Sequence, residues 1–254
     1  MITNPIIQTM LSRKSIRKYK EECPSDEEIE TVVRAGQQAP FASQMGSLLL
    51  SRNRDKNPFK APLLFTICVD SHRWELIMAR RNWKIHSQDD LFLLVLGMQD
   101  AALMAENMVI AAESLGMGSC FLGDAPFRAG KIILEYQLPK RVFPMVQLAM
   151  GYPDENPPPR PRYPIAFTLF ENRYPEFSEE MIQKAMDVMD EGYLAQNYYQ
   201  RLKALIPLRG DREETFTLEN YSWTEHISRK WGQPYFPKTL IQQLEKCGFH
   251  LGSK

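Results

Sequence analysis

The sequence predicts an α+β protein, with an α+β core over residues 1–170 and a helical C-terminal extension over residues 171–254. Three observations lead to this prediction. Segments of strand composition, bounded by polar and proline-containing stretches, occur at residues 47–51, 63–69 and 143–150. One long segment, residues 100–115, has a helical and almost uniformly apolar pattern. Beyond residue 178 the pattern is mainly helical.

Composition excludes several classes of protein. Lys plus Arg and Asp plus Glu number 31 each, so no net field favours nucleic acid or an anionic membrane. The four cysteines lie far apart without a C-x-x-C pair, which argues against a zinc site and a disulfide framework. Uncharged apolar runs such as residues 61–69 are too short to span a bilayer, and the N-terminus lacks the layout of a secretory signal. A reduced, cytoplasmic protein without a metal is therefore expected.

Capping signals mark two helices near the N-terminus. Residues 4–12 begin with Asn-Pro, an N-cap followed by proline in the first turn, which predicts a short helix. Ser25 and Glu28 have capping-box spacing, which predicts a second helix to about residue 38. Pro40 ends that helix because it disfavours a helical conformation at the residue before it.

Residues 100–115 form the clearest helix of the sequence. Its polar side chains fall on one line at seven-residue spacing, and its other faces are apolar and rich in alanine. The residues of this polar line are Asp100, Asn107 and Ser114. Such a helix belongs either to the core or to a subunit interface. Glycines end it, and residues 119–123 should run into the core.

The remaining segments are assigned from composition. Residues 71–88 have a helical pattern crowded with basic and aromatic residues, which fits an amphipathic helix beside a pocket or an exposed helix. Residues 130–136 are predicted to be helical, and residues 166–170 have strand composition. A long helix is predicted after Ser178, to about residue 205. Residues 223–254 predict a short helix, a proline-bounded turn and a final helix from about residue 239.

A basic segment, residues 13–19, is a candidate phosphate site. Arg13, Ser15 and Arg17 alternate, so in an extended backbone their side chains project to one side. Two guanidiniums beside a hydroxyl suit a phosphate, because arginine presents a planar fork of donors. The alternative interpretation is a solvated basic turn after the first helix.

A proline-rich segment follows the strand at residues 143–150. The six prolines between Pro153 and Pro164 prescribe a stiff, extended chain, which carries Arg160 and Arg162. Gly-x-Gly-x-x-Gly and Walker A loops are absent from the sequence, so a nucleotide would have to be held in another way.

In order and spacing, five motifs resemble the FMN-dependent nitroreductase family, in particular its larger NADPH-preferring nitroreductase and flavin reductase branch. The motifs are Arg13-x-Ser15-x-Arg17-x-Tyr19, Ala39-Pro40 through Gln44, Asp100 through Gly123 (in particular Ala111 to Cys120), Gly151-Tyr152-Pro153 with Arg160-x-Arg162, and Trp223 through Arg229 with Leu244 to Phe249. The resemblance implies a three-layer α-β-α fold with a central antiparallel-type sheet and a long buried central helix. It also implies a homodimer in which the C-terminal extension embraces the second subunit.

The resemblance further implies which residues hold FMN. Arg13, Ser15 and Arg17 would bind the phosphate and the flavin pyrimidine edge, with Lys14 near the ribityl chain. The proline-rich segment would bring two more arginines to the same phosphate, and Gly123 would bring its backbone near flavin N5. The implied cofactor-binding residues are Arg13, Lys14, Ser15, Arg17, Ala39, Pro40, Phe41, Ala42, Gln44, Leu122, Gly123, Arg160 and Arg162.

Residues 39–44 are implied to serve the partner's flavin, but they depart from the family pattern. Phe41 stands where the family commonly has Ser, Gln44 replaces the usual Asn, and Gly46 replaces a common Gln. The polar group that meets the ribityl chain or pyrimidine edge therefore stays open, and Phe41 is also a candidate for the substrate side of the pocket.

The implied activity is transfer of hydride from NADPH or NADH through flavin N5 to a nitroaromatic, quinone or flavin acceptor, in ping-pong order. The flavin does the chemistry, so no catalytic side chain is needed, and Arg17 is the candidate for stabilising charge at flavin N1–O2. The four scattered histidines are interpreted as structural. Two alternatives remain: an FMN enzyme with other redox chemistry (dehalogenation, ring oxidation or flavin breakdown), or a non-enzymatic flavin-binding protein.

Two regions bear on substrate choice. Residues 71–97 are expected to form the substrate lid, and their specificity cannot be deduced from the sequence. Basic residues of the C-terminal extension are candidates for the NADPH 2′-phosphate, with an ordinary solvated helix end as the alternative. These basic residues are Arg201, Lys203, Arg209 and Arg212.

Overall fold

The computed structural model describes residues 2–86, 90–234 and 239–251. The chain forms two compact units, Met1–Pro157 with Pro237–Lys254, and Pro158–Phe236. These units divide the chain at 157/158, whereas the sequence suggested 170/171, and they return the C-terminal segment to the first unit. The functional division into a flavin-binding core and an extension stays a prediction.

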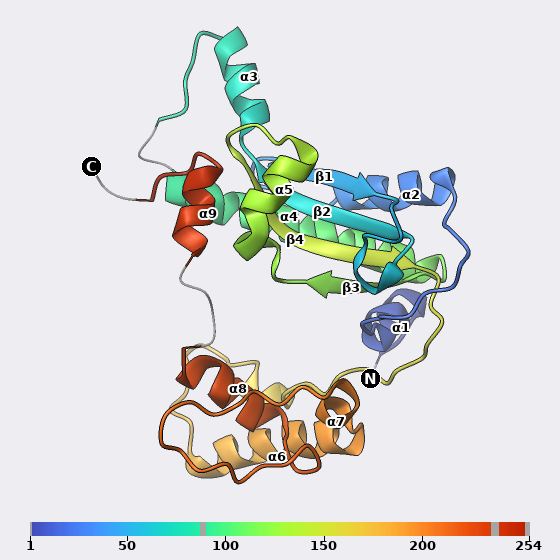
Figure 1. Ribbon diagram of the computed structural model, residues 1–254, viewed down its shortest axis with the longest axis vertical. Coiled ribbons are helices and arrows are strands. Elements are labelled where there is room, and N and C mark those ends of the chain that lie inside the picture. Colours follow the sequence, from blue (N-terminus) through green and yellow to red (C-terminus); the bar gives the residue numbers. More distant parts are fainter. Residues whose placement is uncertain (1, 87–89, 235–238, 252–254) are drawn as a thin grey trace. The chain divides into compact units, whose positions relative to one another are not determined.

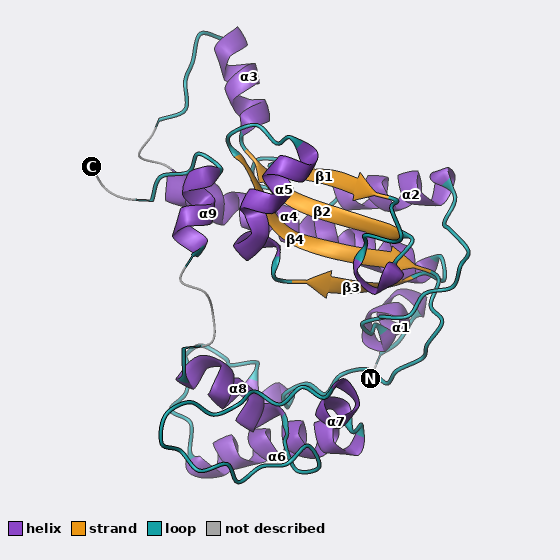
Figure 2. Cartoon of the chain, viewed as in Figure 1, coloured by secondary structure: helices purple, strands orange, loops and turns teal. Residues whose placement is uncertain are grey.

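The first unit contains an antiparallel sheet (Figures 1 and 2). In the described residues its four strands are β1 (Gly46–Ser51), β2 (Leu63–Asp70), β3 (Gly118–Leu122) and β4 (Val142–Gly151). They lie in the order β1-β2-β4-β3, and each neighbouring pair is antiparallel. The structure confirms the α+β class and the antiparallel sheet.

Helices cover the sheet and make up most of the second unit. In the first unit they are α1 (Pro5–Ser12), α2 (Asp26–Gln37), α3 (His72–Arg80), α4 (Asp90–Ser114), α5 (Ala129–Tyr136) and α9 (Leu240–Lys246). The second unit has α6 (Glu179–Ala195), α7 (Tyr198–Leu202) and α8 (Trp223–Gly232). The predicted caps are confirmed: Asn4 accepts the amide of Ile7, and Ser25 and Glu28 form a capping box.

The main core lies between α4 and one face of the sheet. Small residues of α4, such as Ala105 and Ala112, let the helix approach Phe65 on β2 and Leu148 on β4. Helix α4 begins at Asp90, ten residues before the predicted start, because its apolar pattern continues in that direction. It is long and apolar enough to cross a membrane by length and composition alone, but its packing is that of a core helix.

The polar line predicted on this helix is not its exposed face. Asp100 is buried, and the Asn107 side chain donates to the carbonyl of Ala35 at 3.1 Å. Ser114 of that line is exposed in the last turn, but over residues 91–106 the exposed side chains follow a mostly apolar stripe, since at 100° per residue they fall within one third of the helix circumference. This α4 stripe consists of Leu91, Phe92, Val95, Gln99, Ala102, Leu103 and Glu106.

The other face of the sheet is covered by different segments. Ile16 and Tyr19 pack there against Leu64 and Ala149, so the basic segment lies across the sheet. Helix α9 packs beside α5 through Leu244 and other apolar side chains of the C-terminal segment. In Figure 1 helix α5 lies in front of one end of the sheet and α4 lies behind it, which gives the three layers, and α9 lies beside α5 and shares an apolar cluster with Leu94 of α4.

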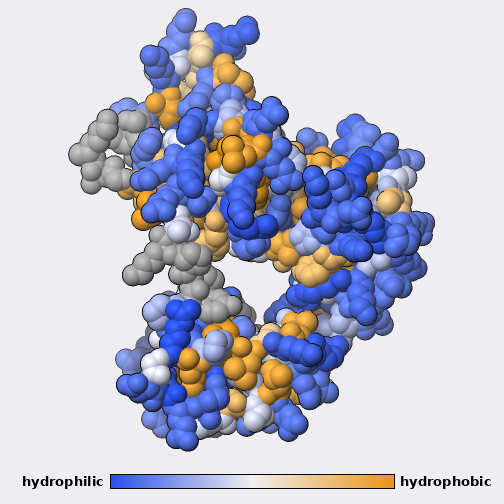
Figure 3. All heavy atoms as spheres, viewed as in Figure 1, coloured by the Kyte–Doolittle hydropathy of each residue, from blue (hydrophilic) through white to orange (hydrophobic). Residues whose placement is uncertain are grey.

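The second unit is held together by aromatic side chains. Tyr193, Tyr199 and Tyr221 are buried with Met189. Other large apolar groups of this unit are exposed, and Figure 3 shows hydrophobic side chains gathered on its visible face. Exposed examples are Ile165, Leu169, Tyr174 and Trp231.

Two predicted elements of this unit are wrong. Residues 166–170 are not a strand: Ile165–Phe167 form a 3₁₀ turn, and Phe167 packs on Tyr163 and Phe177. The long helix after Ser178 ends at Ala195, because Asn197 takes a left-handed conformation (φ 47°) before α7 begins.

The helical pattern of residues 71–88 also yields less helix than predicted. Helix α3 ends at Arg80, Asn82 has a φ of 60°, and residues 87–88 lie outside the described part of the chain. No residue of α3 is fully buried, which favours the exposed interpretation.

Candidate functional site

The basic segment is extended and paired with β3. Ser15 forms a bridge with Ser119, and the amide of Ile16 donates to the carbonyl of Ser119 at 2.9 Å. Ile16 points into the core, so by alternation Ser15 and Arg17 project away from it. The pairing is close: a Cβ on Gly118 would lie 2.5 Å from Cγ1 of Ile16, which explains a glycine there. The prediction that these side chains share one side of an extended chain is consistent with this backbone.

Buried polar atoms beside this segment make no hydrogen bond within the described residues. They include Nη1 of Arg13, Oγ of Ser119 and Oε1 of Glu113. Burial raises the pKa of Glu113, and the charges of Arg13 and Lys14 oppose that rise. A buried guanidinium donor without an acceptor is costly, and a phosphate oxygen would remove this cost. The donors present therefore fit the phosphate of FMN.

Glu155, on the chain leaving β4, fixes the backbone of the basic segment. Its Oε1 accepts the amides of Arg17 and Lys18, the latter at 3.1 Å. Next to it, Asn156 accepts from Nζ of Lys14 at 2.5 Å. The sequence prediction missed Glu155 and Asn156. The only available signal was their position directly after the Gly-Tyr-Pro motif.

The strand end predicted to meet the flavin ring is open. A Cβ on Gly123 would meet nothing within 4 Å, so a flat group can approach this backbone. The following turn is fixed by Arg128, which pairs with Asp124 at 2.8 Å and donates to Gln147 at 3.0 Å. Leu122 is opposite Gln147 in the sheet and also packs near Ile16, so β3 joins the predicted phosphate and ring regions.

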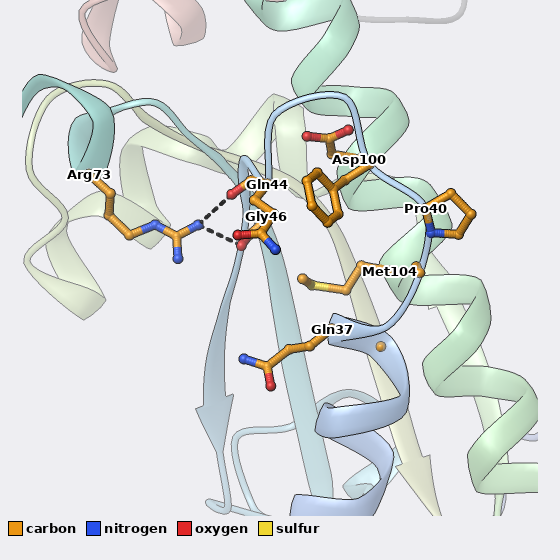
Figure 4. A pocket seen from close by; sticks show the side chains of 10 residues that line it. Gln37, Pro40, Gln44, Gly46, Arg73, Asp100 and Met104 are labelled. Carbon is orange, nitrogen blue, oxygen red and sulfur yellow. Dashed lines mark hydrogen bonds between the residues drawn. The ribbon is translucent and has the colours of Figure 1, made fainter. Parts of the chain in front are cut away.

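The loop of residues 39–45, between α2 and β1, borders a cavity of about 330 Å³ (Figure 4). From α4, the buried carboxylate of Asp100 accepts three backbone amides of this loop. From α3, Arg73 donates to the carbonyls of Gln44 and Gly46. The cavity is lined by Gly36, Gln37, Ala39, Pro40, Phe41, Gln44, Gly46, Arg73, Asp100 and Met104. Asp100 and Arg73 were not predicted as site residues.

The second unit carries the two arginines of the proline-rich segment. The Arg160 guanidinium lies 3.3 Å from the ring centroid of Tyr198, and Nη1 of Arg162 donates to the carbonyls of Arg160 and Pro161. Pro161 is held against α6, because a Cβ on Gly192 would lie 2.6 Å from its Cγ. That both arginines act on the phosphate bound by the basic segment stays a prediction.

The arginines predicted to bind the NADPH 2′-phosphate do not all line the same cavity. Arg209 and Arg212 line a cavity of about 110 Å³ with Ser228, whereas Arg201 lies on α7. The cavity also contains Arg229, but its charge is already paired with Glu214 and Glu225.

His226 has a structural environment, as expected for the histidines. Its ring stacks on Tyr199 at 4.6 Å, and its Nδ1 lies 3.2 Å from the hydroxyl of Tyr221. Burial lowers its pKa, which favours the neutral ring.

Comparison with known proteins identifies similar sequences and folds. A protein-family model described as the nitroreductase family matches residues 10–57 and 47–152, more than half of the chain. The chain is 29% identical over 258 residues to an FMN reductase (NADPH) of Bacillus subtilis, covering 96% of this chain and 97% of that protein. It is 26% identical over 263 residues to an oxygen-insensitive NADPH nitroreductase of Salmonella typhimurium, covering 97% and 98% of the two proteins. The solved structure of NfrA2 from B. megaterium has the same fold, with a TM-score of 0.83, 24% identity, and coverage of 99% and 100% of the two chains.

Proposed function

The chain belongs to the nitroreductase family, and from this premise we propose that it is an FMN-dependent oxidoreductase that takes hydride from NADPH or NADH. The observation that carries the proposal is the buried, unsatisfied Nη1 of Arg13 on the basic segment, which pairs through Ser15 with β3, the strand that ends at Leu122 next to Gly123. The basic segment would bind a phosphate and the backbone at Gly123 would accept a flat ring, as two regions of one site. The names of the relatives, which include FMN and NADPH, support the same cofactor and donor.

Within this proposal the residues bind and orient the cofactor. Arg13, Ser15 and Arg17 supply donors for the phosphate and the pyrimidine edge, and the backbone at Gly123 leaves room for the ring. Bound FMN supplies the hydride-accepting chemistry, and the chain fixes its position. Arg17 is the proposed source of positive charge for flavin N1–O2, held in place through the Glu155 contact with its amide.

The donor and the acceptor use one space in turn, so the kinetics are of ping-pong type. The acceptor is a nitroaromatic, a quinone or a free flavin. Arg209 and Arg212 are proposed to favour NADPH, because two guanidiniums at one small cavity suit a 2′-phosphate. The enzyme is placed in the cytoplasm, where reduced nicotinamides are available and free cysteines stay reduced.

A homodimer is the proposed assembly. The exposed α4 stripe presents Leu91, Phe92, Val95 and Leu103 to solvent, and α1 presents further apolar side chains, including Met10 and Leu11. Contiguous apolar surface of this kind marks interaction sites. A second copy of the chain would cover it and bring its own residues 39–44 to the flavin.

The spectrum of the purified protein tests the function. We expect a yellow protein with flavin absorbance that NADPH bleaches in the absence of oxygen and that an added nitroaromatic restores. A yellow protein that neither nicotinamide bleaches would instead be a flavin carrier, and a colourless protein that does not take up FMN would contradict the proposal.

The phosphate assignment is tested by Arg13→Ala combined with Arg162→Ala. Loss of paired, charge-assisted contacts should weaken FMN binding by several kcal/mol, about 3–6 for two arginines, and give a folded, colourless protein. Arg34→Ala is the control, because Arg34 is an exposed arginine paired with Glu30 on α2. Retention of one FMN per chain by the double variant would overturn the assignment, and the two single variants separate the contribution of each arginine.

A further inference from the structure

Asp100 is a buried carboxylate on the central helix whose contacts are made with a loop far away in sequence. Its residue exposure is 4%. Oδ1 accepts the amide of Ala42 at 2.7 Å, and Oδ2 accepts the amides of Ser43 at 3.1 Å and Met45 at 3.0 Å. Burying a carboxylate is costly unless hydrogen bonds stabilise its charge, so these amides and Asp100 hold each other in place.

The loop has little regular structure of its own to keep its shape. Gln44 has a φ of 51°, in the left-handed region that side-chain-bearing residues rarely adopt. This conformation turns the amides of Ser43 and Met45 toward the same carboxylate oxygen. Strained backbone of this kind persists only where the surroundings determine it.

Arg73 holds the same turn from the opposite side (Figure 4). Its Nη2 donates to the carbonyls of Gln44 at 3.1 Å and Gly46 at 2.7 Å, and its Nε pairs with Asp70 at 3.1 Å. The loop is thus fixed by its amides to α4 and by its carbonyls to α3. Both anchors lie within the first unit.

The loop so held forms a wall of the 330 Å³ cavity. Phe41, which directly precedes the anchored amides of Ala42 and Ser43, has 54% of its surface exposed, and it lines this cavity with Gln44. A displacement of the loop backbone would move both side chains together. The shape of this cavity therefore depends on where Phe41 is held.

We infer that Asp100, with Arg73, is a positioning residue that sets the residue 39–45 loop and thereby selects which electron acceptor the enzyme reduces. The inference rests on the proposed function. Neither side chain need touch the acceptor, since each acts through the loop backbone and Phe41.

Asp100→Asn tests this inference against a matched control on the same helix. Asn keeps the size of the side chain but replaces an accepting oxygen with an NH2 group, which would face a loop amide. Asp90→Asn is the control: Asp90 is 3% exposed and also accepts a backbone amide, from His250, but pairs with Arg141 far from the loop in sequence. Both changes remove one buried negative charge from α4.

The readout is the ratio of kcat/KM for 4-nitrobenzoate to kcat/KM for 1,4-benzoquinone, with NADPH as donor. We expect Asp100→Asn to retain FMN and to change this ratio by about tenfold, because a displaced loop orients the two acceptors differently and small misplacements have large effects on rate. Asp90→Asn should lower thermal stability and change the ratio less than about twofold. Hydrogen exchange at the amides of Ala42, Ser43 and Met45 should accelerate in Asp100→Asn alone.

An unchanged ratio in a folded Asp100→Asn variant would overturn the inference. If that variant does not fold, Arg73→Met decides, because the Arg73 side chain is half exposed and its loss should be tolerated. This variant must shift the ratio as well, and an unchanged ratio overturns the inference. Failure of the proposed function has a different signature: the unaltered protein would then lack FMN or fail to oxidise either nicotinamide.

Discussion

Single carboxylates on the chain hold backbone segments that carry the site. Glu155 accepts the amides of Arg17 and Lys18, and Asp100 accepts those of the residue 39–45 loop. In both cases the acceptor lies more than fifty residues from its donors. Every residue except proline has a backbone N–H group, so the pattern of side chains in the sequence does not show which amides a distant carboxylate will accept.

Glu155→Ala should loosen the basic segment. Two backbone donors would lose a charged acceptor, which we expect to cost about 1–3 kcal/mol of unfolding free energy and to weaken FMN binding as Arg17 loses its fixed position. Urea unfolding and titration of the FMN-free protein with FMN measure the two effects.

Glu30→Ala is the control for this change. Glu30 forms an exposed ion pair with Arg34 on α2, whose loss should cost no more than about 0.5 kcal/mol. Equal FMN affinity in the Glu155 and Glu30 variants would show that Glu155 does not position the site.

At the scale of elements, the helices and strands predicted correctly were those marked by signals within a few neighbouring residues. The caps at Asn4 and Ser25, and three strands of the sheet, were predicted because their signals are local: capping spacing and apolar runs. The 3₁₀ turn at Ile165–Phe167 was missed, since its apolar composition is equally that of a strand and the aromatic partners decide between them. The break at Asn197 was missed because Gln and Asn are tolerated within helices.

Of the candidate site, the sequence predicted the extended basic segment and a segment at residues 119–123 that runs into the core, but not that the two are paired. The residues that hold these segments were missed, and the sequence left open which side of α4 belongs to the core and which to a subunit interface. The polar line predicted on this helix carries the buried Asp100, so the periodicity of its side chains does not identify the exposed side.

The crossing of α4 over β2 depends on Gly97. A Cβ there would lie 2.4 Å from Cγ1 of Val69, a stiff β-branched side chain in a buried strand. We expect Gly97→Ala to destabilise the protein by about 1–3 kcal/mol in urea unfolding, because overpacking outweighs the gain in helix propensity.

Gly232 provides the comparison, as a helical glycine whose added Cβ would meet nothing within 4 Å. Gly232→Ala should be neutral or stabilising by up to about 1 kcal/mol. If both substitutions stabilise the protein, the close approach of α4 to β2 is not a constraint on the fold.

At the scale of the whole molecule, the central helix serves two purposes. One side of α4 forms the core with β2 and β4, and the opposite side is the exposed α4 stripe. Membrane-spanning helices have similar length and composition, but here the apolar residues on the first side pack on the sheet. We therefore expect another protein to cover the stripe, and the proposed site requires that this protein be a second copy of the chain.

Phe92→Glu tests that requirement. Phe92 is 64% exposed on the stripe, so a monomer should tolerate the charge, whereas a dimer that buries the residue would have to desolvate a carboxylate without a partner. Sedimentation equilibrium should show a dimer for the unaltered protein and a monomer for the variant, with FMN affinity at least about tenfold weaker because the partner's residues 39–44 are lost.

Leu134→Glu on α5, which places the same charge at an exposed leucine outside the stripe, should leave both measurements unchanged. A Phe92→Glu variant that stays dimeric would exclude the α4 stripe as the interface, and a monomeric variant with full FMN affinity would show that each flavin site is complete in one chain.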